Sequence, residues 1–466
     1  MSELWQLDAL ELAARIRAGT TTSREVVEAH LARIDAVNPF LNAVVRRLDE
    51  EALAAADVAD AAIRDGAANG VFHGVPVSVK ENIDLAGTPT TQAVPALADA
   101  IAPIDAPSVE RMRAAGAIPF VRTNLPDFGL RVHTDSSLHG LTRNPHHPGR
   151  TAGGSSGGEA SAIASGMSPL GLGNDIGGSL RNPAHCCGIS SIKPSVGVIP
   201  MATVIPPEDM TIASQQMVVE GPMARSIADV RAAFEVLAGP HPRDPRSLPV
   251  RLTDLGEGER LRIAVVAEPP GGRTDPEIAA AVRAAGDILA DAGHDVVEAT
   301  PPDYELTIDM WTALLLGDIA VMRGVLDEVM GDGGRRLLDN FQASAPPPSL
   351  ELAAHVQSTR YRLMREWTAF FLTHPVILSP TWGLPAFEHG ADLDDAESIL
   401  RDTLRPVLPA NLLALPGVVV PCGTADGLPV GVQVIGDRFT DLRCLSVAEQ
   451  IQRVVGVPAP IDPVVA

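Results

Sequence analysis

The sequence predicts an α/β fold in a single domain, with a central twisted mixed β-sheet covered by helices on both faces. Short apolar segments typical of strands alternate with helical patterns along the whole chain. The 466 residues are 45% hydrophobic, which is enough for a large core. Proline and glycine are spread throughout instead of being pooled in a linker, so we expect residues 1–466 to form one domain.

The N-terminal segment, residues 1–65, is predicted to be helical. Thr22 and Glu25 have the spacing of a capping box, in which each side chain accepts from the backbone N–H of the other residue. The apolar positions that follow, up to Ile34, repeat with helical spacing. An alanine-rich helix is expected over residues 50–64.

The segment over residues 71–235 has a different character. A short apolar strand over residues 75–79 ends at Lys80, and a polar, glycine-rich loop is expected over 142–158. The remaining expected elements are a strand over 117–121 and helices over 108–115, 160–165 and 227–237.

The second half of the chain is predicted to continue the alternation. Residues 300–372 look helical and hold much of the bulky apolar content, with Met, Trp and Leu gathered in 310–330 and 361–371. Strands are expected over 261–266, 295–297, 418–420 and 430–435, and helices over 277–290 and 441–454.

The charge balance argues against a nucleic-acid partner. Lys and Arg total 36 against 58 Asp and Glu, a formal net charge of −22. Such a surface repels phosphate backbones, and no basic block counteracts it. The acidity is spread over helical faces, as expected of a well-hydrated surface.

The cysteines and the N-terminus predict a cytoplasmic protein. Four cysteines in so long a chain are no disulfide framework, and the adjacent Cys186 and Cys187 do not have the spacing of metal ligands. The amphipathic, acidic N-terminus is unlike a signal peptide, and no apolar run is long enough to span a membrane. We expect no metal site, because no His-x-x-x-His or paired-cysteine pattern occurs.

Two glycine-rich segments, residues 150–159 and 174–184, are candidates for function. A Gly/Ser run taken alone is usually a flexible loop. A phosphate-binding P-loop is excluded because no lysine follows the last glycine. A dinucleotide-binding motif is excluded by the glycine spacing.

A nucleophile elbow at Ser155 is a further alternative. Residues 153–157 satisfy Gly-x-Ser-x-Gly, but an elbow needs a strand immediately before the serine. The proline-containing residues 144–149 cannot form a central strand.

Ser179 has the better local chemistry for a nucleophile. It follows Gly177 and Gly178 and opens an expected helix. Glycines let backbone N–H groups turn toward one point, and a helix start leaves further N–H groups free. Together these donors suit an oxyanion hole.

A nucleophilic serine also needs a base. None of the 12 histidines lies in a recognisable catalytic context. Lys80 follows a buried-looking strand, where loss of hydration would lower the pKa of its amine and make the neutral form usable as a base. Isolated at a strand end, however, a lysine is most often a surface residue.

These residues together resemble the amidase signature family. The resemblance covers nearly the whole chain and is weakest over residues 240–400. It rests on Lys80, Gly153-Gly154-Ser155-Ser156-Gly157-Gly158, Asp175-Ile176-Gly177-Gly178-Ser179-Leu180-Arg181, Asn124-Leu125-Pro126-Asp127-Phe128-Gly129, Gly221-Pro222-Met223 and Gly427-Leu428-Pro429-Val430-Gly431. The chain departs from the family pattern at Ala152 and at Val198.

The resemblance implies the amidase signature fold, with residues 71–235 as its catalytic core and a Ser-cisSer-Lys triad. Ser179 would attack the carbonyl, and Ser155, after a cis peptide bond from Gly154, would relay the proton to neutral Lys80. Supporting residues would be Gly154, Ser156, and Asp175 with Arg181 as an ion pair, although helix capping explains the last two nearly as well. The expected oxyanion hole consists of the backbone N–H groups of Ile176, Gly177, Gly178 and Ser179.

The implied function is an amidohydrolase that cleaves the C–N bond of small or medium amides without a cofactor. Aryl amides, anilides and carbamates (urethanes) are suggested by the bulky residues in 310–330 and 361–371, with simple core packing as the other explanation. The alternatives are a glutaminase subunit of a tRNA-dependent amidotransferase, a catalytically silent binding module, and an α/β-hydrolase with Ser155 as nucleophile. A homodimer is common in such families, but no residue indicates one.

Overall fold

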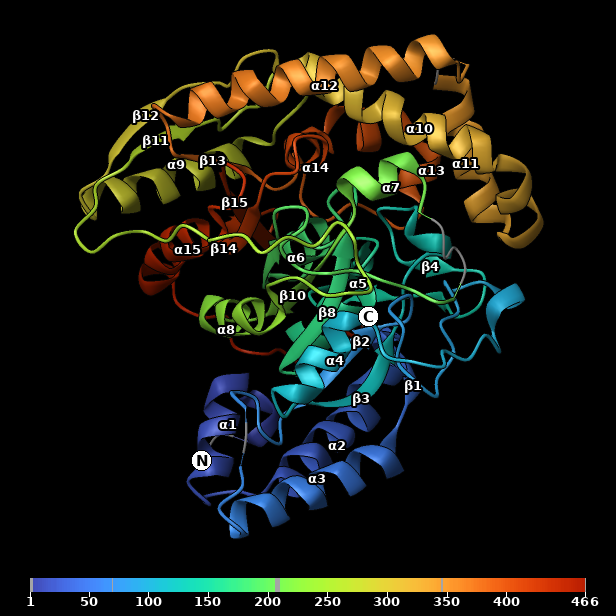
Figure 1. The fold of residues 1–466 in the computed structure, drawn as a ribbon, viewed down its shortest axis with the longest axis vertical. Coiled ribbons are helices and arrows are strands. Elements are labelled where there is room, and N and C mark those ends of the chain that lie inside the picture. Colours follow the sequence, from blue (N-terminus) through green and yellow to red (C-terminus); the bar gives the residue numbers. More distant parts are fainter. Residues whose placement is uncertain (1–2, 69, 206–209, 345–346, 466) are drawn as a thin grey trace.

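The computed structural model describes residues 3–68, 70–205, 210–344 and 347–465, and their main feature is a large mixed sheet (Figure 1). Eleven described strands lie in the order β1-β3-β2-β8-β10-β9-β14-β15-β13-β11-β12. Strand β2 runs parallel to both β3 and β8, and β11 runs parallel to β12 and β13, whereas the central pairs are antiparallel. The strands are β1 (Val44–Arg47), β2 (Pro76–Lys80), β3 (Ile118–Thr123), β8 (Leu170–Asp175), β9 (Ser190–Lys193), β10 (Val219–Ala224), β11 (Arg262–Val265), β12 (Asp295–Glu298), β13 (Val376–Pro380), β14 (Gly417–Ala425) and β15 (Leu428–Gly436).

Helices cover both faces of this sheet, which confirms the predicted single α/β domain. One face packs against α4, α8, α9 and α15, and the other against α5 and α6. Helices α1–α3 lie at one end of the molecule and α10–α12 at the opposite end (Figure 1). The helices are α1 (Ala9–Arg17), α2 (Ser23–Leu41), α3 (Asp49–Arg64), α4 (Pro107–Ala114), α5 (Gly157–Ala164), α6 (Arg181–Cys187), α7 (Ile212–Met217), α8 (Ile227–Leu237), α9 (Pro276–Asp291), α10 (Tyr304–Val329), α11 (Asp332–Ser344), α12 (Leu350–Phe371), α13 (Ala391–Asp394), α14 (Leu408–Leu412) and α15 (Asp441–Val455).

The start of α2 shows how local sequence determines an element. The Thr22 side chain accepts from the Glu25 N–H, and the Glu25 carboxylate accepts from the Thr22 N–H, so the predicted capping box is confirmed. The helix then runs beyond Ile34 to Leu41 and ends at Asn42, which adopts a left-handed conformation.

The structure corrects the predicted N-terminal segment and the predicted loop. Residues 1–65 are not wholly helical, because β1 pairs with β3 at the sheet edge. The loop predicted over 142–158 contains β6 (Arg143–Asn144) and β7 (His147–Thr151), which pair outside the main sheet, and the first turn of α5. Proline and glycine in this segment concealed the short hairpin.

Strand β8 was missing from the sequence prediction although it lies near the centre of the sheet. Leu170 and Leu172 point into the main apolar core, while Gly171 and Gly173 occupy the alternate positions. Two glycines in six residues conceal an alternating strand pattern. No helix in the described part of the chain is long and apolar enough to cross a membrane.

Candidate active site

Lys80 is the last residue of β2 and lies inside the protein. Val77 and Val79 point into the main core, so the alternation of the strand turns Ser78 and Lys80 to the face that α5 covers. The Lys80 side chain is fully buried. Lys80 is therefore not a surface residue, although a lysine at a strand end usually is.

The glycines of β8 make room for polar groups beside Lys80. A Cβ on Gly173 would lie 2.7 Å from Ser156 Oγ, and a Cβ on Gly171 would collide with the Glu159 carboxylate. Both Ser156 and Glu159 come from the start of α5. Glu159 is buried, and its two oxygens accept from the hydroxyls of Ser78 and Thr123.

The Lys80 amine has three polar neighbours. Nζ lies 2.7 Å from Ser155 Oγ, 3.0 Å from Ser156 Oγ and 2.7 Å from Asn174 Oδ1. Asn174 in turn donates from Nδ2 to Asn82 Oδ1 at 2.9 Å. The amine therefore has one partner for each of its three tetrahedral positions.

Burial lowers the pKa of the Lys80 amine to about 7, although the negative charges of Asp175 and Glu159 oppose the shift. Burial also raises the pKa of Glu159 to about 7. At neutral pH a large fraction of Lys80 is therefore the neutral amine, which can accept a proton.

Ser155 and Ser179 lie on the same cavity. Ser155 follows a cis peptide bond from Gly154, and the Ser156 N–H donates to the Ser179 carbonyl at 3.2 Å, which links the two serine segments. Ser155 is 1% exposed and Ser179 7% exposed. No hydrogen bond joins the two hydroxyls in the described structure.

The strands that precede the two serines differ, and Ser179, unlike Ser155, follows a strand of the main sheet at a strand–turn–helix junction. Ser179 lies between β8 and α6, separated from β8 by the turn Ile176–Gly178. The strand before Ser155 is β7, which pairs with β6 outside the main sheet. The geometry that an elbow requires is thus absent at Ser155.

The turn before Ser179 is held by Asp175 and Trp311. Asp175 accepts from the N–H groups of Gly178 and Leu180, at 2.8 Å and 3.1 Å. Trp311 Nε1 donates to the Ile176 carbonyl at 3.0 Å, and a Cβ on Gly177 would lie 2.6 Å from the Trp311 ring. Only glycine lets this turn pack against the indole.

One member of the expected oxyanion hole is already engaged. The Gly178 N–H donates to Asp175 Oδ1 in this structure, while the set of four donors stays a prediction. The Gly177 and Ser179 N–H groups donate to no other described residue. The signal available in the sequence was Asp175 itself, three residues before Gly178, a spacing typical of side-chain capping.

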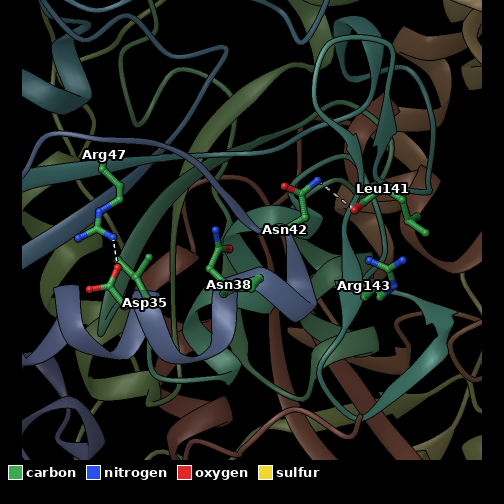
Figure 2. Close-up of a pocket in the computed structure, with 8 residues that line it drawn as sticks. Asp35, Asn38, Asn42, Arg47, Leu141 and Arg143 are labelled. Atoms are coloured by element: carbon green, nitrogen blue, oxygen red, sulfur yellow. Dashed lines mark hydrogen bonds and ion pairs between the residues drawn. The ribbon is translucent and has the colours of Figure 1, made fainter. Parts of the chain in front are cut away.

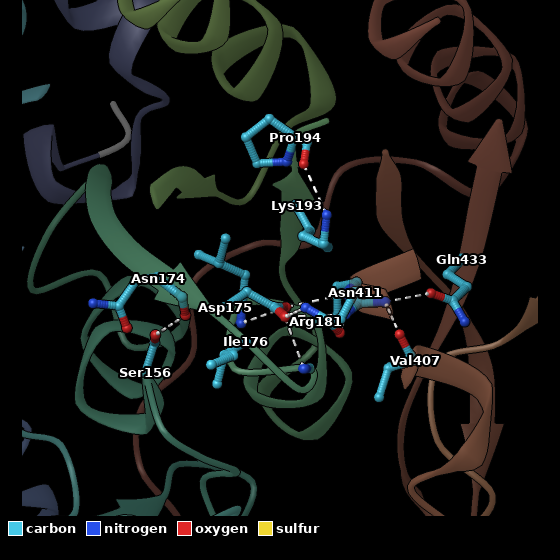
Figure 3. Close-up of polar contacts among 12 residues, drawn as sticks. Ser156, Asn174, Asp175, Ile176, Arg181, Lys193, Pro194, Val407, Asn411 and Gln433 are labelled. Atoms are coloured by element: carbon cyan, nitrogen blue, oxygen red, sulfur yellow. Dashed lines mark hydrogen bonds and ion pairs between the residues drawn. The ribbon is translucent and has the colours of Figure 1, made fainter. Parts of the chain in front are cut away.

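Asp175 and Arg181 form the expected ion pair within a larger buried network (Figure 3). Arg181 donates to both carboxylate oxygens of Asp175 at 3.0 Å, to Asn411 Oδ1 and to the Val407 carbonyl. Burial alone would raise the pKa of Asp175, but the charge and hydrogen bonds of Arg181 outweigh it and hold that pKa well below its usual range. Ion pairing and capping therefore act together here.

The cavity beside the serines has a volume of about 170 Å³ and a largely apolar wall. Helix α10 contributes Leu315, Ile319, Met322 and Leu326 at helical spacing. Further lining residues include Phe128, Leu130, Ile176, Met201, Met210 and Val218, together with the acidic residues Asp84, Glu220 and Asp318. The aromatic residues of 361–371 do not line it, since Trp367 and Phe371 pack in the core between α10 and α12.

A wider depression of about 520 Å³ lies beside α2, away from these serines (Figure 2). Its polar side chains have structural partners: Arg47 pairs with Asp35, and Asn42 donates to the Leu141 carbonyl. It contains none of the expected catalytic residues, so the cavity at Ser179 is the candidate active site.

The sequence prediction missed two residues of the site, Asn174 and Asn82. Asn174 stands directly before the Asp175 motif on the undetected strand β8, and Asn82 follows Lys80 by two residues. Recognition of β8 as a parallel neighbour of β2 would have brought Asn174 to the same strand end as Lys80.

Comparison with known proteins shows the family to which the chain belongs. Residues 25–445 match the family model described as Amidase. The chain belongs to the amidase signature family. An indoleacetamide hydrolase of Bradyrhizobium diazoefficiens is 40% identical over 462 residues, covering 98% of this chain and 88% of the relative. This amidase signature protein is therefore an amide-cleaving hydrolase.

Two further relatives show the breadth of the amidase signature family. One component of the glutamyl-tRNA(Gln) amidotransferase of Salinispora arenicola is 32% identical over 496 residues and covers 99% of both chains. The crystal structure of a bacterial aryl acylamidase of the family superposes with a TM-score of 0.85 at 26% identity, covering 97% of both chains.

Proposed function

We propose that this amidase hydrolyses small, uncharged amides or carbamates carrying an aromatic ring, with Ser179 as nucleophile, Ser155 as proton relay and Lys80 as base. The observation that carries the proposal is the fully buried Lys80 amine, 2.7 Å from Ser155 Oγ, beside a cavity that both serines line. General bases are most effective when their pKa lies near the working pH, and that of Lys80 is about 7.

The proton path follows from these positions. As Ser179 Oγ attacks the carbonyl carbon, its proton passes to Ser155 Oγ and the Ser155 proton passes to Lys80 Nζ. The developing oxyanion is received by N–H groups of the expected set Ile176, Gly177, Gly178 and Ser179, of which Gly178 already donates to Asp175. When the C–N bond breaks, Lys80 returns its proton through Ser155 to the leaving nitrogen. Water then takes the place of that amine, is deprotonated by the same pair, and releases the acid.

The cavity supports a compact aromatic substrate. An engineered protein cavity of roughly 150 Å³ holds a benzene molecule, and the volume here is about 170 Å³. The Leu and Met side chains of α10 give the wall an apolar, adaptable surface. The names of the indoleacetamide hydrolase and the aryl acylamidase agree with an aromatic amide.

A glutaminase role is the second candidate, since the amidotransferase component of Salinispora arenicola matches 99% of the chain. Glutamine carries a carboxylate, which proteins usually bind with arginine or lysine. The described residues that line the cavity include Asp84, Glu220 and Asp318 but no arginine or lysine. This charge pattern favours the small neutral amide.

The decisive experiment is to label the purified chain with a fluorophosphonate probe and to map the modified residue by mass spectrometry. We expect labelling at Ser179, and its loss in Ser179→Ala and Lys80→Ala. Ser168→Ala is the matched control, because Ser168 is a buried serine bonded to the Leu170 carbonyl, outside the cavity. Labelling at Ser155 would reverse the two serine roles.

A substrate panel run in parallel tests the specificity. We expect aryl amides and anilides to be hydrolysed by the isolated chain at higher kcat/KM than short aliphatic amides. Equal turnover of the two classes would overturn the aromatic preference. Absence of both labelling and turnover would favour a protein that works only within a complex, or a silent module.

A further inference from the structure

The Lys80 amine faces two neighbouring hydroxyls, and the direction of its hydrogen bonds decides whether it can act as a base. A neutral amine has two N–H donors and one lone pair. Three acceptor-capable atoms surround Nζ: Ser155 Oγ, Ser156 Oγ and Asn174 Oδ1. Only an amine whose lone pair points at Ser155 can take the proton of that serine.

Both carbonyl groups of Asn174, in its side chain and its backbone, accept hydrogen bonds in this arrangement. Its side-chain oxygen, 2.7 Å from Nζ, can only accept, so it takes one N–H of Lys80. Its backbone carbonyl accepts from Ser156 Oγ at 3.4 Å (Figure 3). A Ser156 hydroxyl that donates to this carbonyl presents its lone pairs to Lys80 and takes the second N–H.

Asn82 fixes the orientation of the Asn174 carboxamide. Nδ2 of Asn174 donates to Asn82 Oδ1 at 2.9 Å, so a flipped amide would place two acceptors together at Asn82 and two donors together at Lys80. Asn174 is 7% exposed, and its backbone is held in β8, between β2 and β10. The carboxamide oxygen is thus held toward the amine.

We infer that Asn174, held by Asn82, is a positioning residue that directs the lone pair of neutral Lys80 at Ser155. The inference rests on the proposed role of Lys80 as base and adds the residue that makes the amine directional. Asn174 acts through Lys80 and needs no contact with the reacting carbonyl.

The test uses Asn174→Asp, which keeps the shape and the acceptor but adds a charge at 2.7 Å from Nζ. The charged groups that already act on Lys80 are Asp175 of β8 and Glu159 of α5. An added carboxylate so close raises an amine pKa by about 1–3 units. We expect the acid limb of kcat/KM to move to higher pH by at least about one unit, with activity largely recovered above the new limb.

Two further variants separate positioning from a structural role. Asn82→Asp places the added charge further from Lys80 Nζ, beyond the Asn174 carboxamide. The acid limb of kcat/KM should therefore move in the same direction but by less than in Asn174→Asp. Asn174→Ala keeps no acceptor, so kcat should fall about tenfold or more with little change in KM and no upward shift of the limb. Thermal melting of each variant reports folding.

An Asn174→Asp enzyme with an unshifted limb, or with a loss of activity that high pH does not restore, would overturn the inference. Persistent probe labelling of Lys80→Ala would instead overturn the proposed base, so the two failures are distinguishable.

Discussion

The pH dependence of turnover follows from the buried amine of Lys80. With a pKa of about 7, the neutral fraction of Lys80 is about 0.9 at pH 8 and about 0.1 at pH 6. Because the proposed base can accept the Ser155 proton only as the neutral amine, kcat/KM should fall about tenfold between these values and then tenfold for each further unit of acidity. The assay is initial-rate hydrolysis of an aryl amide without titrating groups.

Glu159 is the other buried group beside Lys80 that titrates near pH 7, so the limb must be assigned. Its negative charge raises the pKa of Lys80, so Glu159→Gln should move the limb to lower pH, by up to about one unit, and leave its shape intact. A flat profile between pH 6 and pH 8 in the parent enzyme would refute the reasoning. Loss of the limb in Glu159→Gln would assign it to the carboxyl group instead.

Three further changes test the framework of the site. Asp175→Asn leaves the Arg181 guanidinium buried without its counter-charge, so the free energy of unfolding measured in urea titrations should fall by about 3–5 kcal/mol. The control Arg150→Ala breaks a pair with the exposed Asp426 and should lower it by less than about 1 kcal/mol. Gly171→Ala drives a methyl group into the Glu159 carboxylate and should lower the melting temperature and abolish labelling, while Gly317→Ala, on a helix with open space around it, should do neither. Met322→Ala removes part of the cavity wall and enlarges the cavity, so the ratio of kcat/KM for two-ring amides to that for one-ring amides should rise several-fold. Val321→Ala, at an exposed position on the same helix, should leave this ratio unchanged. An unaltered ratio in Met322→Ala would show that the ring binds elsewhere.

The sequence allowed the fold class and the family motifs to be predicted because both depend on local signals. The strand before Lys80 and the capping box of α2 appear directly in the residue order. The Asp175 motif could likewise be recognised without knowledge of its neighbours in space.

The parts that could not be predicted depend on tertiary partners. Gly171 and Gly173 look like loop residues until α5 is known to supply Ser156 and Glu159 in the space they leave. Asn174 has no significance in isolation, because its role arises from β8 lying beside β2. The engagement of Gly178 by Asp175 was equally invisible, since a glycine-rich turn permits several directions for each N–H.

Trp311 places a constraint on how the substrate range of this enzyme can evolve. It lies on α10 one turn before Leu315, so the helix that shapes the cavity wall also holds the turn before the proposed nucleophile Ser179. Substitutions at or near Trp311 would disturb the reaction rate together with selectivity, because Trp311 is the described α10 residue that hydrogen-bonds to that turn, whereas Ile319, Met322 and Leu326 on the later turns line the cavity without such a bond. Diversification toward new amides is therefore expected to accumulate in the second half of the helix, where a new wall leaves the nucleophile in place.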